Sequence, residues 1–129
     1  MLAALLLAAA LTGSTCANPS IISTSTQSVT TNNGLNHYTI AIVVRNIGTV
    51  RQPSNLLQSV EVLQDGGKVG QMGLQPLRAH QSQTVTYGFN RSADSGAGTT
   101  LLTFTLVFKG PSGHNVDCHA GTETTVFSL

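Results

Sequence analysis

The sequence predicts an all-β protein whose seven short strands form an antiparallel sandwich. Two features of the chain predict this fold class. Apolar and polar residues alternate with a period of two along most of the chain beyond residue 17, as expected for strands that bury one face. Gly, Asn and Asp residues separate these stretches at the spacing that is typical of a sandwich. No segment between them has the length and the capping residues of a helix.

Composition supports an all-β domain with an uncharged polar surface. Hydrophobic residues make up 40% of the 129 residues and charged residues only 9%. This hydrophobicity argues against disorder, and so few charges argue against a helical bundle, whose exposed faces need Glu, Lys and Arg. The length is enough for one domain. With a net charge of +1, the chain has no electrostatic reason to bind nucleic acid or an anionic membrane.

The first 17 residues predict a secretory signal peptide. Leu2 to Leu11 are all Leu or Ala. This run is too short to span a bilayer, but it matches the apolar region of an export signal. Thr15 and Ala17 fit the two small positions before a cleavage site, so the predicted mature domain is residues 18–129. The mature chain is then expected in the periplasm or outside the cell. The alternative interpretation of the run is a buried helix of the fold, although it has no amphipathic stripe.

The two cysteines, Cys16 and Cys118, have different predicted fates. Cleavage after Ala17 removes Cys16 and leaves Cys118 as a free thiol or as half of an intermolecular bridge. Alternatively, Cys16 is the lipidated first residue of a lipoprotein, although Gly13 and Thr15 do not match the residues usual before such a cysteine. Contact with a membrane is therefore expected only if Cys16 is lipidated.

Alternation places seven strands and their buried faces. The clearest stretch has Ile40, Ile42 and Val44 on one face and Arg45 on the other, so the Arg45 side is the solvent face. Asp65-Gly66 predicts a tight hairpin turn, and the strand that begins at Lys68 is expected at a sheet edge. The predicted strands are residues 21–29, 37–45, 57–63, 68–74, 82–89, 100–108 and 122–127. The predicted core consists of Ile40, Ile42, Val44, Val60, Val62, Val85, Tyr87, Leu102, Phe104 and Leu106.

One cluster of ligand-type residues predicts a candidate metal site. It consists of His114, Asp117, Cys118 and His119. Imidazole and thiolate together are suitable ligands for Zn(II) or copper, and one loop that carries them could wrap an ion. Their spacing matches no established zinc signature, and the competing interpretation is a polar loop with an incidental or buried Cys118. We therefore predict no cofactor and keep His114, Cys118 and His119 as the alternative metal site.

No motif in the chain predicts an enzyme. His119 is adjacent to Cys118 in sequence and is poorly placed to act as its general base. The chain contains neither the Gly-x-Ser-x-Gly motif nor a phosphate-binding Gly loop, and its five Asp and Glu residues are scattered. We expect no catalytic residues.

Four segments of the chain share more specific patterns: VVRNIGT from Val43, SVEVLQDGGKVGQ from Ser59, LRAHQSQTVTYGF from Leu77 and TLLTFTLVF from Thr100. On these segments the chain resembles the bacterial cell-adhesion-related domain family, known as CARDB. The resemblance implies a seven-stranded immunoglobulin-like domain with a broad adhesion-related role and no catalytic residues. His80 stands where the family often has Gly, so His would have to adopt any positive φ that this turn needs.

These observations together predict an exported binding, adhesion-type or structural module without catalytic activity. Its contacts are expected at edge strands and at two loops, Asn90 to Gly98 and Gly110 to Gly121. The expected partner is a protein or polysaccharide of the cell envelope. The alternative is a periplasmic metal-binding protein that uses His114, Cys118 and His119.

Overall fold

The computed structural model describes residues 16–94, 96, 98–109 and 123–129. In this part of the chain all regular structure is β, which confirms the predicted fold class. No helix among the described residues is long and apolar enough to cross a membrane. Each of the seven predicted strands is present. They are β1 (Pro19–Asn32), β2 (Leu35–Asn46), β3 (Leu57–Gln64), β4 (Gly67–Leu74), β5 (Ser82–Ser92), β6 (Leu101–Lys109) and β7 (Glu123–Ser128).

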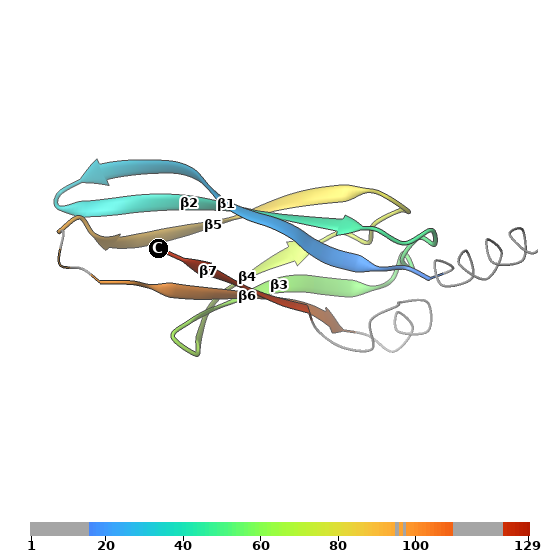
Figure 1. The fold of residues 1–129 in the computed structure, drawn as a ribbon. Coiled ribbons are helices and arrows are strands. Elements are labelled where there is room, and N and C mark those ends of the chain that lie inside the picture. Colours follow the sequence, from blue (N-terminus) through green and yellow to red (C-terminus); the bar gives the residue numbers. More distant parts are fainter. Residues whose placement is uncertain (1–15, 95, 97, 110–122) are drawn as a thin grey trace, which may run out of the picture.

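The strands form two antiparallel sheets that pack face to face as a β-sandwich (Figure 1). One sheet has the order β1-β2-β5 and the other the order β4-β3-β6-β7. The chain crosses between the sheets after β2, β4 and β5, and at the two sides β4 lies next to β5 and β1 next to β7. In an antibody constant domain the fourth strand belongs to the same sheet as the first two strands. Here the fourth strand, β4, pairs with β3 and belongs to the other sheet.

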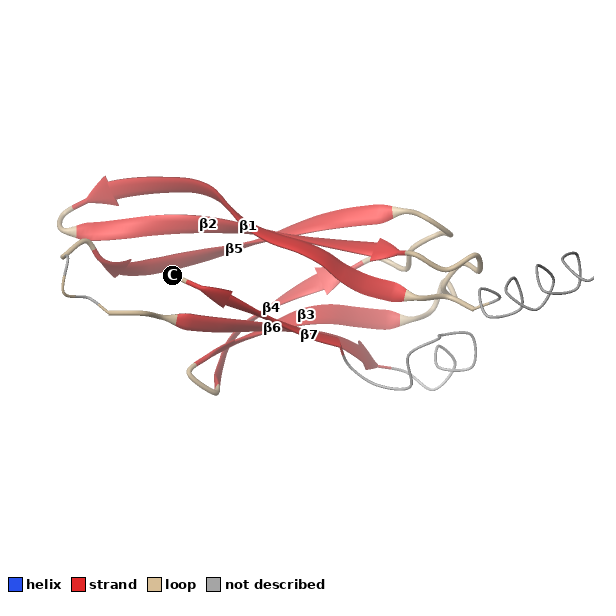
Figure 2. Cartoon of the chain, viewed as in Figure 1, coloured by secondary structure: helices blue, strands red, loops and turns tan. Residues whose placement is uncertain are grey.

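Two tight turns, one in each sheet, are made by similar residue types. Asp65 (φ 49°) and Gly66 (φ 90°) join β3 to β4, which confirms the predicted hairpin. Asn33 (φ 53°) and Gly34 (φ 76°) join β1 to β2 in the same manner. This second turn extends β1 and β2 beyond the ends predicted from alternation, and the hairpin reaches past the strands of the opposite sheet (Figure 2).

The core lies between the sheets, as predicted. Nine of the ten predicted core residues are buried, and Tyr87 is half-buried. The register explains this, since Ile42 lies opposite Val85 in one sheet and Val62 opposite Phe104 in the other. The Tyr87 ring meets Phe104 edge-on, with ring centroids 6.5 Å apart. The structure adds Leu74, Leu77 and Phe89 to the same cluster.

Buried amide side chains close the end of the sandwich at which β2 finishes. Asn46 uses all four of its hydrogen-bonding positions, to Asn18 N (2.9 Å), Gly48 N (3.0 Å), Val50 O (2.9 Å) and Leu77 O (3.2 Å). Beside it, the amides of Gln52 and Gln58 donate to each other at 2.9 and 2.8 Å. Gln52 Oε1 also accepts from Leu77 N at 2.9 Å. A buried hydrogen-bond network of this kind holds the loops at this end in one arrangement.

His80 takes part in the same end of the fold. Its φ of 65° lies in the left-handed region, so His occupies a turn position that favours Gly. The His80 N–H donates to Asn46 O at 2.7 Å, which fixes the turn before β5 against the end of β2.

Candidate functional site

The predicted metal ligands His114, Cys118 and His119, together with Asp117, lie outside the described residues. The same holds for the whole of the predicted contact loop from Gly110 to Gly121. In the described part of the chain, no group of three or more His, Cys, Asp or Glu side chains is placed to hold a metal ion. The metal-binding interpretation therefore stays a prediction.

Cys16 and Ala17, which the sequence assigned to the signal peptide, belong to the described structure. Cys16 is disulfide-bonded. The sequence contains one other cysteine, Cys118, which lies outside the described residues. The expectation of a free Cys118 thiol therefore applies only to a chain that has lost Cys16.

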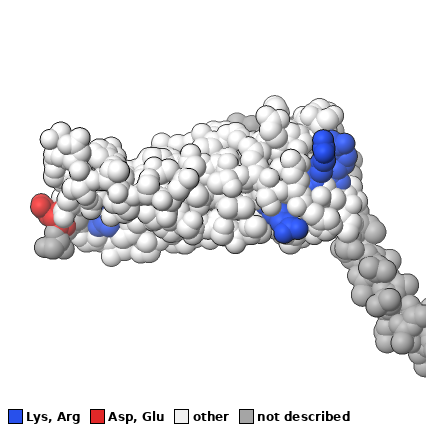
Figure 3. Space-filling model, turned by 90° about the horizontal axis from the view of Figure 1, so that it is seen from above, with Lys and Arg blue, Asp and Glu red and all other residues white. Residues whose placement is uncertain are grey.

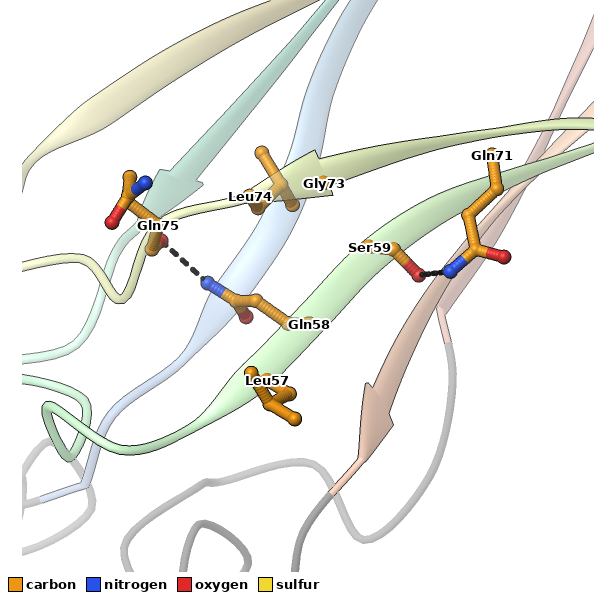
Figure 4. A pocket seen from close by; sticks show the side chains of 7 residues that line it. All are labelled: Leu57, Gln58, Ser59, Gln71, Gly73, Leu74 and Gln75. Atoms are coloured by element: carbon orange, nitrogen blue, oxygen red, sulfur yellow. Dashed lines mark hydrogen bonds between the residues drawn. The ribbon is translucent and has the colours of Figure 1, made fainter.

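A hollow of about 450 Å³ lies beside the start of β3 and the end of β4 (Figure 4). Gln58 Nε2 donates to Gln75 O at 2.8 Å, and Gln71 Nε2 donates to Ser59 Oγ at 2.9 Å. A Cβ added at Gly73 would meet no atom within 4 Å, so this part of the hollow is open. None of the lining residues is titratable, which suits the hollow to a neutral group and not to acid–base chemistry. The lining consists of Leu57, Gln58, Ser59, Gln71, Gly73, Leu74 and Gln75.

The outer face of the β1-β2-β5 sheet carries small, uncharged side chains. The register aligns them in rows across the three strands, such as Ser25–Ala41–Thr86 and Ser28–Thr39–Gly88. In the space-filling view of this side, charged side chains lie toward the two ends and leave the middle free of charge (Figure 3). The residues that form these rows carry no charge for an ionic partner.

β1 differs from the other strands at the sheet edges. Within the described sheets the edge strands are β1, β5, β4 and β7. β5 carries Arg91, β4 carries Lys68 and β7 carries Glu123, whereas none of the 14 residues of β1 is charged. On β4 the charged side chain of Lys68 is also held in place, because its Nζ lies 3.2 Å from Glu61 Oε1 and 2.9 Å from Gln71 Oε1.

Charges and Pro on an edge strand discourage the addition of another strand, so β1 lacks the usual charged protection. From Ser23 to Asn32 its residues are exposed, apart from the half-buried Thr24. Pro19 at the start of β1 and two irregularities, at Ile22 and at Gln27, that interrupt its pairing with β2 are the edge-protecting features of this strand. β1 is therefore the edge best suited to pairing with an added strand.

The described part of the predicted contact loop Asn90 to Gly98 is tied to the β1–β2 hairpin. Ala93 N donates to Gly34 O at 2.9 Å. The guanidinium of Arg91 donates to Gly98 O, and His37 Nδ1 lies 2.6 Å from Asn90 Oδ1. These bonds hold the end of β5 against β2 and the β1–β2 turn, and β2 lies between β5 and β1.

Aromatic side chains do not provide a sugar-binding platform on the described surface. The sequence has six aromatic residues, and the side chain of Phe108 is not among those described. The other five pack on the core between the sheets. They are Tyr38, Tyr87, Phe89, Phe104 and Phe127.

No protein-family model matches this chain, and no curated protein matches it. The resemblance to CARDB therefore stays a prediction, and the candidate site is judged from its own geometry.

Proposed function

We propose that this chain is an exported, non-catalytic binding module that pairs an extended segment of a partner polypeptide with the edge of β1. The observation that carries the proposal is the absence of any charged residue from the 14 residues of β1, whereas each other edge strand has one. In strand addition, main-chain hydrogen bonds supply affinity and alternate side chains supply specificity. An adhesion-type or assembly role, as the sequence predicts, would use such a contact.

The chemistry of β1 selects the partner segment. On the outer face the added strand would lie beside Ser25 and Ser28, and on the inner face beside Thr26 and Val29. Small hydroxyl side chains offer no counter-charge, so a charged residue brought against them would lose hydration without gaining a partner. We therefore expect an uncharged segment rich in Thr and Val, residue types that suit a half-exposed pleated surface.

A polypeptide partner is favoured over a polysaccharide by the placement of the aromatic rings. Stacking of sugars needs exposed aromatic faces, and the five described aromatic side chains pack on the core. The edge of β1 instead offers backbone groups, which recognise another backbone without regard to its sequence. The envelope partner predicted from the sequence is accordingly proposed to be a protein.

The proposal is tested by selecting a displayed random-peptide library on the purified chain. We expect enriched peptides to be uncharged and to slow amide hydrogen exchange in β1. Ser25→Lys/Ser28→Lys should abolish their binding, because both positions are exposed on β1 and would place charge beside the added strand. The matched control is Ser54→Lys/Asn55→Lys, which adds the same charge at exposed loop positions. Equal loss in both variants, or exchange protection that spares β1, would overturn the proposal.

A further inference from the structure

We infer that the leader is removed before Cys16, so that Cys16 and Ala17 remain in the mature protein as the first residues of the domain. The inference concerns processing and holds whichever partner the domain binds. It places the cleavage upstream of the bond after Ala17 that small-residue spacing alone favours. Four independent contacts of the segment from Cys16 to Pro19 support it.

The first contact is the packing of Ala17 and Pro19 inside the domain. Ala17 is 0% exposed, and Pro19 is among the fully buried side chains. Residues that a signal peptidase is about to remove have no reason to be enclosed by the domain that they leave. Loss of Ala17 would expose the surfaces that now pack against it. The domain would then lose stability, as it does when any buried apolar group is removed.

The second contact is the backbone of Asn18. Its N–H donates to Asn46 Oδ1 at 2.9 Å, and its carbonyl oxygen accepts from Ile47 N at 2.9 Å. Cleavage after Ala17 would turn this neutral amide into a charged amine against the wholly buried Asn46. Such a charge gains only a neutral oxygen as partner and loses much of its hydration.

The third contact is the close approach of the Cys16 backbone to Gly48. A Cβ at Gly48 would lie 2.0 Å from Cys16 O and 2.8 Å from Asn18 N. The backbone of Cys16 therefore occupies the space in which any other residue at position 48 would place its side chain. The structure thus requires Gly48 because Cys16 is present, and the most severe of these clashes would vanish in a chain that began at Asn18.

The fourth contact is the disulfide at Cys16. Within the chain it can only involve Cys118, the one other cysteine in the sequence. Joining two thiols releases two protons and two electrons, which a disulfide-donating oxidoreductase of the exporting compartment would accept. A sulfur atom in a disulfide cannot also carry a thioether-linked lipid, so the same contact argues against lipidation of Cys16.

Small residues also precede Cys16 at the spacing that cleavage needs. Thr12 and Ser14 form one such pair, and Gly13 and Thr15 form another. A cut after Ser14 or after Thr15 leaves Cys16 in the mature chain. Ala8 and Ala10 provide a third pair, and we place the cleaved bond between Ala10 and Cys16.

The test is to express the full chain with its own leader in an exporting bacterium and to analyse the processed protein. We expect N-terminal sequencing to start at a residue between Leu11 and Cys16. In the unfolded protein, alkylation should add no group before reduction and two groups after it, as measured by intact mass. A chain that starts at Asn18 and carries one alkylatable thiol would overturn the inference. A chain that starts at Cys16 with an added acyl mass would agree with cleavage before Cys16, but it would overturn the disulfide argument, because a lipidated sulfur cannot form the bridge.

Discussion

The side chain of Asn46, at the end of β2, accepts a hydrogen bond from the backbone N–H of Asn18, just before β1, at 2.9 Å. Asn46 is fully buried, and the same side chain also bonds Gly48, Val50 and Leu77. One residue thus joins the first strand of the domain to the loop after β2 and to the segment before β5. The three-stranded sheet, including the edge that we propose as the binding site, depends on this junction.

Asn46→Ala should therefore destabilise the domain by roughly 2–5 kcal/mol, because it leaves several buried backbone groups without partners. The free energy of unfolding, measured by urea denaturation, tests this expectation. Asn55→Ala is the matched control, since Asn55 is exposed in the loop before β3. A loss below about 1 kcal/mol in Asn46→Ala would show that water replaces these bonds without cost.

Phe104→Ala should destabilise the domain by about 3–5 kcal/mol, as expected when a buried aromatic side chain is removed. Phe104 is 0% exposed and is the largest of the fully buried side chains among the described residues. Since a domain of this size has only about 5–15 kcal/mol of stability, the variant should be partly unfolded at moderate temperature. Val126→Ala serves as the control, because Val126 is 60% exposed on β7 and should change the unfolding free energy by less than about 0.5 kcal/mol. Similar losses in both variants would contradict the assignment of the buried face.

The strands and the core could be predicted from the sequence because the cause is local. Alternation of the kind seen at Ile40, Ile42 and Val44 both favours a strand and names its buried face, and the register confirms it. Asp65-Gly66 predicted its turn for the same reason, and the Asn33-Gly34 pair is a local signal of equal strength that explains the longer β1–β2 hairpin.

The candidate site could not be predicted in the same way, because it depends on pairing between distant residues. The sequence of β1 shows that it has no charge, but not that it lies at an edge, which depends on β2 pairing with β5 on its other side. The spacing of Thr15 and Ala17 fits a cleavage motif, whereas the burial of Ala17 depends on the fold around it. Nor does the sequence alone show that Gly48 faces Cys16.

Gly48→Ala should lower stability by about 1–3 kcal/mol, because the new Cβ meets backbone atoms that a rotamer change cannot move. Gly73→Ala is the matched control: nothing lies within 4 Å of its added Cβ, and its φ is not in the left-handed region. This control should not lower stability, since alanine in a strand loses less conformational freedom on folding than glycine. Thermal unfolding of the two variants separates a specific clash at Gly48 from a general intolerance of alanine. Equal melting temperatures would mean that the segment around Cys16 moves aside readily.

Reduction should destabilise the processed protein, because Cys16 is disulfide-bonded and its segment begins the first strand. A bridge that closes a loop of about 100 residues is worth roughly 2–5 kcal/mol, mostly by restricting the unfolded chain. We therefore expect a lower melting temperature in the presence of a thiol reductant. Cys16→Ser should melt at that lower temperature with or without the reductant, and it should still fold, because Ala17 and Asn18 keep their buried contacts. A melting temperature of the unchanged protein that does not respond to reductant would show that the domain folds without this bridge, and would remove the disulfide from the support for an N-terminus before Cys16.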